Sequence, residues 1–127
     1  MIAQNEAGQN RILLVDDQPE VRETIKLLLG MDGHSITEAA NGQEALELFR
    51  RGQFELVITD YAMPLMRGDE LANNIKLLSP SQPILMITGS IEKFGVPETS
   101  VDVLLQKPFL LEDLRQAVAK ALCQVAA

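Results

Sequence analysis

Four short apolar runs, rich in Leu, Ile and Val, recur along the chain. They span residues 12–15, 56–59, 84–87 and 103–106. The runs show little alternation between apolar and polar positions, a pattern that favours strands buried on both faces of a parallel sheet. A fifth segment, 35–39, is more polar, which predicts a weaker strand at an edge of the sheet.

Between these segments, apolar residues recur every three or four positions, as expected of amphipathic helices. The stripes consist of Val21, Ile25, Leu28 and Leu29; of Ala45, Leu48 and Phe49; of Leu71, Ile75 and Leu78; and of Leu111, Leu114, Val118, Ala121 and Val125. Strands and helices therefore alternate, which predicts an α/β fold of five βα units. Segment 89–100 holds two glycines and a proline, so we expect a fourth helix that is short or irregular.

Single residues mark where some of these helices begin and end. Pro19 suits the first turn of the first helix, and Gly30 and Gly33 are expected to end it. Asn41-Gly42 predicts a turn before the second helix. These signals place the helix boundaries but say nothing about chemistry.

Length and composition are those of one soluble domain. The chain has 127 residues, of which 46% are hydrophobic, enough for a core. We expect residues 1–9 to be a flexible tail and residues 10–127 to form the domain. Its 11 basic and 18 acidic residues give a net charge of −7 without a basic cluster, which argues against direct nucleic-acid binding. No apolar stretch approaches the roughly 20 residues of a membrane span, and a cytoplasmic location is expected.

Two rare residues receive no functional role. Cys123 is the only cysteine, which excludes an intrachain disulfide, and it is expected to be a small apolar filler in the last helix. His34 is the only histidine and follows Asp32-Gly33. We interpret it as a solvated loop residue rather than a phosphorylation site.

Chemistry-bearing residues stand where the predicted strands end. Asp16 and Asp17 follow the first run, Asp60 follows the run at 56–59, Thr88 follows the run at 84–87, and Lys107 follows the last run. Carboxyl ends of parallel strands converge on one crevice. The sequence therefore predicts an acidic pocket that also holds one hydroxyl and one cation.

Three clustered carboxylates need a cation. Each like-charge pair at ~4 Å is unfavourable by roughly 4 kcal/mol at an effective dielectric near 20. Mg²⁺ fits because it prefers carboxylate oxygens, water and phosphate oxygens. Lys107 adds a second positive charge, so the pocket could neutralise a phosphoryl group attacked by an aspartate. Read singly, the acidic pair could instead cap a helix, Asp60 could cap a loop and Thr88 could be structural.

Together, these residues resemble the receiver domain of two-component response regulators, the CheY-like superfamily. The resemblance rests on Asp16-Asp17, on Asp60 followed by Met63-Pro64, on Thr88 and on Lys107-Pro108-Phe109, and it covers about residues 10–124. It implies a flavodoxin-like, doubly wound, five-stranded parallel sheet of order 2-1-3-4-5. It also implies phosphotransfer to Asp60 from a histidine kinase or a histidine phosphotransfer protein.

The resemblance further implies a role for each residue of the pocket. Asp17 and Asp60 would bind Mg²⁺ or Mn²⁺ directly, Asp16 would act through water, and the backbone carbonyl of Ala62 would complete the protein ligands. Thr88 and Lys107 would bind the phosphoryl oxygens. The peptide bond between Lys107 and Pro108 would be cis.

The chain also departs from the family pattern. Leu104 stands where family members often carry an aromatic switch residue, and Arg67 replaces a frequent acidic residue, an exchange for which we expect no effect. The stretch between Thr88 and Lys107 is shorter than usual, so we expect a monomer or weak dimer. Ala62 and Ser90 are too small to orient a water, so slow to moderate self-dephosphorylation is expected, and no other enzymatic activity.

Three other functions fit less well. A phosphatase or phosphotransferase with an aspartyl intermediate typically places Asp-x-Asp after its first strand, and Asp16-Asp17-Gln18 lacks that spacing. A docking module that keeps the fold without phosphorylation does not need the full acidic, hydroxyl and lysine set. In a flavodoxin-like flavin carrier, acids after the first strand would repel the flavin phosphate. The sequence leaves open the output domain or downstream target.

Overall fold

A five-stranded parallel sheet forms the centre of the molecule in the computed structural model, which describes residues 10–89 and 101–126, with side chains up to Cys123. The expected tail, Ser90 and the expected fourth helix lie outside the described residues. The strands are β1 (Arg11–Val15), β2 (Ser35–Ala39), β3 (Leu56–Asp60), β4 (Ile84–Thr88) and β5 (Val103–Gln106). Their order is β2-β1-β3-β4-β5, which confirms the predicted topology.

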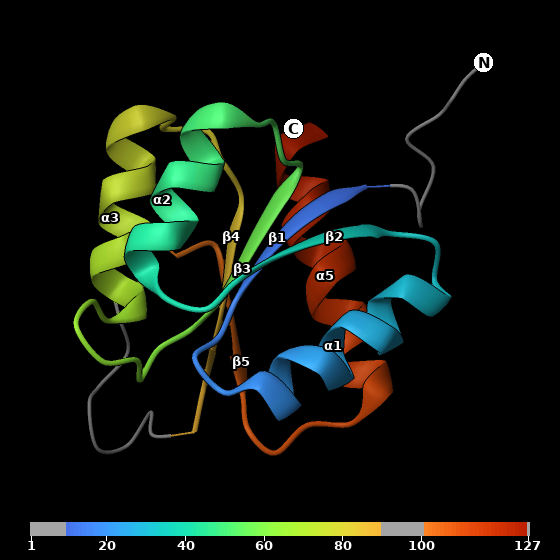
Figure 1. Cartoon of the computed structure of the whole chain (residues 1–127). Helices are drawn as coiled ribbons and strands as arrows, with labels where there is room; N and C mark the ends of the chain where they lie inside the picture. The colour runs from blue at the N-terminus through green and yellow to red at the C-terminus, as the bar shows by residue number, and fades with distance from the viewer. Residues whose placement is uncertain (1–9, 90–100, 127) are drawn as a thin grey trace.

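In the described part of the chain, four helices cover the two faces of this sheet, as can be followed in Figure 1. They are α1 (Pro19–Met31), α2 (Gly42–Arg51), α3 (Gly68–Leu78) and α5 (Leu111–Ala126). In Figure 1, α1 and α5 lie on one face, and α2 and α3 lie on the other. The apolar residues of β1 alternate accordingly: Ile12 and Leu14 join the core under α1 and α5, whereas Leu13 and Val15 join the core under α2 and α3.

Coverage of both faces explains the unbroken apolar runs. All five residues of β3 and all five of β4 are buried, so neither face tolerates a regular polar alternation. β2 is only partly buried over most of its length and lies at an edge of the sheet, as its polar sequence predicts.

The helix boundaries follow from local capping with one correction. Asn41 caps α2 by accepting the N–H of Glu44 at 2.8 Å, and the Glu44 carboxylate accepts the N–H of Ala40 at 2.8 Å. The prediction that Gly30 ends the first helix was wrong, because α1 continues through it to Met31. The chain turns at Gly33, whose φ is 91°, a conformation that favours glycine.

Four side chains differ in burial from what the sequence led us to expect. Leu78 is 50% exposed at the end of α3, although it was assigned to the buried stripe, whereas the unassigned Leu46 is buried in α2. Cys123 is exposed and is not a filler. His34 is half-buried rather than solvated, with its Nδ1 accepting the N–H of Asn10 at 3.4 Å, and burial lowers its pKa.

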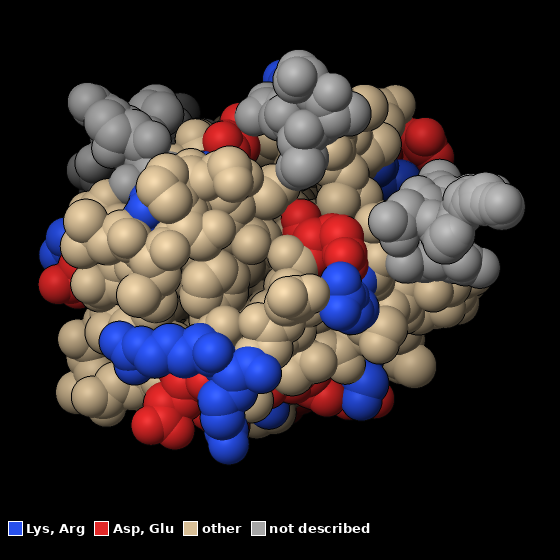
Figure 2. Space-filling view, turned by 90° about the horizontal axis from the view of Figure 1, so that it is seen from above, with Lys and Arg blue, Asp and Glu red and all other residues tan. Residues whose placement is uncertain are grey.

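Charged groups are mixed at the end of the molecule where the strands begin. Figure 2 views this end, and its Lys and Arg side chains lie close to Asp and Glu side chains. One such pair joins Arg11 to Glu55 at 2.6 Å. Within the described part of the chain, no helix is long and apolar enough to cross a membrane.

Candidate metal and phosphoryl site

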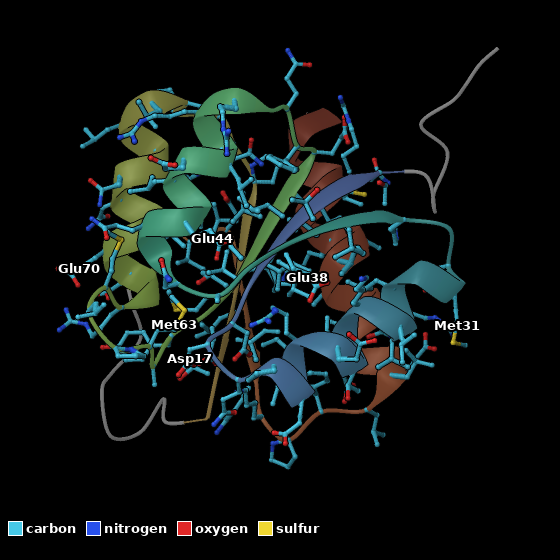
Figure 3. The ribbon with its side chains drawn as sticks, viewed as in Figure 1. Asp17, Met31, Glu38, Glu44, Met63 and Glu70 are labelled. Atoms are coloured by element: carbon cyan, nitrogen blue, oxygen red, sulfur yellow. The ribbon has the colours of Figure 1, made fainter. Side chains whose placement is uncertain are left out.

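The site lies at the opposite end, where the strands finish. β1 and β3 are neighbours, with Val15 opposite Thr59. Asp16 follows Val15 and Asp60 ends β3, so parallel pairing carries both carboxylates to the same edge of the sheet. Figure 3 shows Asp17 at the lower end of β1.

Three carboxylates meet at this edge. One carboxylate oxygen from each of Asp16, Asp17 and Asp60 lies within 4.8 Å of the others. Asp16 and Asp60 are buried and Asp17 is half-buried. A donor set of oxygens alone, with this density of negative charge, fits a hard divalent cation such as Mg²⁺. The structure thus brings together the three acids that the sequence predicted to cluster.

Lys107, the residue directly after β5, contacts the cluster. Its Nζ lies 2.9 Å from Oδ1 of Asp60, and its backbone N–H donates to the carbonyl of Thr88 at 2.8 Å. That backbone bond extends the pairing of β4 with β5 by one residue and so directs the lysine to the site. The bond between Lys107 and Pro108 is cis, as the resemblance implied.

Burial is the largest influence on the pKa values of Asp16 and Asp60 in this site. Burial raises the pKa of Asp60, and the hydrogen bond and charge of Lys107 only partly offset this effect. Burial also raises the pKa of Asp16, where the N–H of Gln18 acts in the opposite direction. The nearby Asp17 charge raises the pKa of both groups. One lysine does not balance three acids, so a divalent cation would stabilise their ionised forms.

The alternative interpretation of the acidic pair as a helix cap does not hold. Gln18 occupies the N-cap of α1, and its side chain makes no capping hydrogen bond. Asp16 instead accepts the N–H of Gln18 through Oδ1 at 2.9 Å. This bond orients the carboxylate beside the site without using it to cap the first helical turn.

Thr88 reaches the same edge from β4. Asp60 is opposite Ile87 in the pairing of β3 with β4, so Thr88 lies one residue beyond this pair. Thr88 as a whole residue is 5% exposed. A hydroxyl here stands on the strand between those that carry Asp60 and Lys107, which suits a donor to a group bound on Asp60.

The loop after β3 contains two features that the sequence analysis missed. A Cβ on Gly68 would clash with the carbonyl oxygen of Asp60 and crowd Cα of Tyr61. The N–H of Gly68 donates to the carbonyl of Tyr61 at 2.9 Å, so α3 begins directly against the end of β3. Leu65 has a φ of 73° and is 95% exposed, an uncommon conformation for a leucine. Glycine in a loop is too frequent to identify such contacts from sequence.

The side chain of Arg67 makes local contacts at the start of α3. Its guanidinium contacts Asp69 at 3.0 Å and lies 6.0 Å from the centroid of the Tyr61 ring. These local contacts account for its side chain and are compatible with the expectation that it has no role in the chemistry. Leu104 lies half-buried on β5, opposite Met86.

Comparisons with known proteins agree with this geometry. The chain matches the family model described as the response regulator receiver domain over residues 12–119. It is 35% identical over 107 residues to the response regulator MprA of Mycolicibacterium vanbaalenii, covering 82% of this chain and 46% of MprA. It is 35% identical over 122 residues to the response regulator protein PilR of Pseudomonas aeruginosa, covering 91% of this chain and 26% of PilR.

The autoinducer 1 sensor kinase/phosphatase LuxN of Vibrio campbellii also matches. It is 31% identical over 109 residues, which make up 84% of this chain and 13% of LuxN. The chain thus spans less than half the length of each of these curated relatives.

Solved structures give the same result. The response regulator protein TrrA from Thermotoga maritima, in complex with Mg²⁺ and BeF, is 35% identical with a TM-score of 0.82, covering 89% of this chain and 99% of that one. TrrA in complex with the histidine kinase ThkA gives a TM-score of 0.81 at 35% identity, covering 89% of this chain and 98% of that one.

Proposed function

The chain belongs to the response regulator receiver domain family, and on that premise we propose that it is a phosphoacceptor switch whose acceptor is Asp60. The contact between Lys107 Nζ and Asp60 Oδ1 at 2.9 Å carries this assignment. Among the three clustered acids, Asp60 is the one that this lysine contacts. A phosphoryl group formed on its carboxylate would therefore begin beside a fixed cation.

Asp17 and Asp60 would hold Mg²⁺ directly, Asp16 would do so through water, and the Ala62 carbonyl would complete the protein ligands. The acid cluster supports this assignment, as does TrrA, a relative of known structure that binds Mg²⁺ and BeF. When bound, the metal supplies positive charge for the phosphoryl oxygens. Mn²⁺ has the same preference for oxygen ligands and would serve in its place.

The transfer step needs positioning more than acid–base chemistry. A carboxylate oxygen of Asp60 attacks the phosphorus of a phosphohistidine, a P–O bond forms, and the P–N bond breaks with its electron pair leaving on the imidazole. Lys107 then holds a phosphoryl oxygen in place of the carboxylate oxygen that it contacts at rest. The Thr88 hydroxyl donates to another phosphoryl oxygen, and this draws the end of β4 towards Asp60.

The donor would be a histidine kinase or a histidine phosphotransfer protein. The relative TrrA has been solved with the histidine kinase ThkA. A groove of about 500 Å³ runs between α1 and the loop before α5, lined by residues that include Val21, Leu28, Lys107 and Phe109. Because Lys107 lines the groove and also contacts Asp60, an apolar helical face in this groove would bring its histidine to the acceptor.

We further propose that catalysis is limited to the chain's own phosphorylation and slow dephosphorylation. Ala62, two residues after Asp60, carries no group that could orient a hydrolytic water. The leucine at position 104 would leave the usual aromatic switch absent, and the chain would act as a monomer or weak dimer in the cytoplasm. An output domain or a separate protein would receive the signal.

Chemical mapping of the acyl phosphate tests this function. The chain is phosphorylated by a small phosphodonor with Mg²⁺, reduced with borohydride to convert the acyl phosphate to an alcohol, digested and sequenced by mass spectrometry. We expect the reduced residue at position 60 and unmodified Asp16 and Asp17. Modification of another aspartate would contradict the assignment, no modification would favour the docking module, and turnover of a generic phosphomonoester would favour the phosphatase.

A further inference from the structure

An arginine on α1 reaches back to the loop that carries the acidic pair. Nη1 of Arg22 donates to the backbone carbonyl of Asp16 at 2.7 Å. The Arg22 side chain is only 18% exposed, so its position is fixed by packing as well as by this bond. None of the candidate roles of the pocket residues uses this arginine.

A glutamate on β2 orients the guanidinium. Nε of Arg22 donates to Oε1 of Glu38 at 3.0 Å, and Nζ of Lys26 donates to Oε2 of the same residue at 2.9 Å. Glu38 is opposite Leu14 in the pairing of β1 with β2, and Leu14 belongs to the core under α1. Figure 3 shows Glu38 between β2 and α1. The carboxylate therefore faces the helix that carries both cations.

The bond from Arg22 is one of three that hold Asp16. The backbone N–H of Asp16 donates to the carbonyl of Ala39 at 3.2 Å, and Oδ1 of Asp16 accepts the N–H of Gln18 at 2.9 Å. Only three residues separate the end of β1 from Pro19 at the start of α1. Of the three hydrogen bonds, only the one from Arg22 goes to the backbone carbonyl of Asp16.

The carbonyl of Asp16 also restricts where the Cα atom of Asp17 can lie. The peptide unit that joins the two residues is planar, so its oxygen, the nitrogen of Asp17 and Cα of Asp17 share one plane. Fixing the oxygen fixes the rotation of that plane about the Cα–C bond of Asp16. The side chain of Asp17 starts from the Cα at the far end of this plane.

From this geometry we propose that Arg22, oriented by Glu38, is a positioning residue for the metal site: it sets the peptide plane between Asp16 and Asp17 and thereby the direction of the Asp17 carboxylate. This inference rests on the proposed function. Arg22 contacts the backbone of Asp16 and acts through it. Residues that orient metal ligands typically change metal affinity by about 10–100-fold when they are mutated.

Lys26 provides a matched control. It shares Glu38 with Arg22, lies on the same helix and carries the same charge, but its described contact is with Glu38 rather than with the loop. Removing either cation lowers the positive charge near the acids, which by itself strengthens the attraction for Mg²⁺. Weaker Mg²⁺ binding after loss of Arg22 would therefore be opposite to the charge effect. It would indicate that the Asp17 carboxylate is no longer held in position.

The test is the Mg²⁺ dissociation constant of the full chain, measured by calorimetry for the wild type, Arg22→Met, Arg22→Lys, Glu38→Gln and Lys26→Met. We expect Arg22→Met to weaken binding about tenfold and Lys26→Met to leave it unchanged or slightly tighter. Arg22→Lys can serve Asp16 or Glu38 but not both, so partial rescue is expected. Glu38→Gln keeps an acceptor for Nε and should have a smaller effect than Arg22→Met.

Thermal unfolding without metal distinguishes an effect on the position of Asp17 from a general loss of fold stability. We expect Arg22→Met and Lys26→Met both to lower the midpoint slightly, while only the first weakens Mg²⁺ binding. Equal Mg²⁺ affinity in wild type and Arg22→Met would overturn this inference alone. If the wild-type chain bound no Mg²⁺, the proposed function would fail as well. Should Arg22→Met not fold, an Mg²⁺ affinity of Arg22→Lys equal to that of Lys26→Met would overturn it.

Discussion

The ammonium group of Lys107 lies 2.9 Å from Oδ1 of Asp60, across two strand ends that β4 separates. The side chain of Lys107 is 32% exposed and that of Asp60 is 9% exposed. The pair therefore joins a buried carboxylate to a cation that solvent and an incoming partner can reach. The paired groups are those that would form and hold an acyl phosphate.

Replacing Lys107 by Met should slow phosphorylation of Asp60 by about 100-fold, the size of effect seen when one preorganised donor to a developing charge is lost. Mg²⁺ affinity should hold or increase, because the acids remain and a competing cation is gone. Rates of mass gain with a small phosphodonor measure the first effect, and calorimetry measures the second. Lys107→Arg keeps the charge and should be less impaired. A normal rate for Lys107→Met would exclude the lysine from the step.

Replacing Gly68 by Ala should destabilise the fold by about 2–3 kcal/mol, because the added Cβ meets the backbone of Asp60 and Tyr61. Gly30→Ala is the matched control. Nothing lies within 4 Å of a Cβ there, and Gly30 is inside α1, so this substitution should stabilise by about 0.5–1 kcal/mol. Urea unfolding of both variants measures the difference. Equal effects would show that α3 can move away from the strand end.

Stability without metal should depend on pH through the buried acids. Burial raises the pKa of Asp16 and of Asp60 in the folded state. A carboxyl of this kind contributes stability that is complete below its unfolded pKa of about 3.9 and is lost as the pH rises through its folded pKa. Asp60→Asn cannot lose a proton. It should therefore exceed the metal-free wild type in stability by about 1 kcal/mol at pH 7, with the gap narrowing towards pH 4.

With Mg²⁺ present, the wild type should become more stable than Asp60→Asn. Mg²⁺ would stabilise the wild type more at about pH 8 than at about pH 5, because protons compete with the metal for carboxylates, and it should stabilise Asp60→Asn less at both. Thermal unfolding with Mg²⁺ and with a chelator at each pH measures the effect. A wild-type stability without metal that rises from pH 4 to pH 7 relative to the variant would contradict the assigned direction of the pKa shifts.

Leu65→Asn should stabilise the chain by about 0.5–1 kcal/mol, because asparagine tolerates the positive φ at this position better than leucine does. Leu65 is 95% exposed, so little burial is lost. Leu65→Ala removes the same exposed side chain but does not gain tolerance of a positive φ, so it should change stability little. Chemical unfolding would refute the idea if both variants behaved alike.

The strand runs made the fold predictable because both faces of the sheet are covered. β1, β3 and β4 read as unbroken apolar runs, and the polar character of β2 correctly placed it at an edge. The order of strands came from the family resemblance rather than from the runs. The clustering of Asp16, Asp17 and Asp60 followed, because neighbouring parallel strands bring their ends together.

Features that depend on where a helix ends or how far a side chain extends could not be predicted from the sequence. Helical spacing placed Leu78 with Ile75, but α3 ends at this residue and leaves it half outside the core. His34 is partly covered because the chain enters the sheet beside it at Asn10. The sequence did not single out Arg22, because its bond to Asp16 depends on the path of a long side chain between a helix and a loop.

Intact mass after incubation with acetyl phosphate tests the central claim most directly. The wild type with Mg²⁺ should gain the mass of one phosphoryl group. The gain should be absent with a chelator and absent in Asp60→Asn, which keeps the size of the acceptor but lacks its nucleophilic carboxylate. A phosphoryl gain that persists in Asp60→Asn, or one that does not depend on Mg²⁺, would contradict the account.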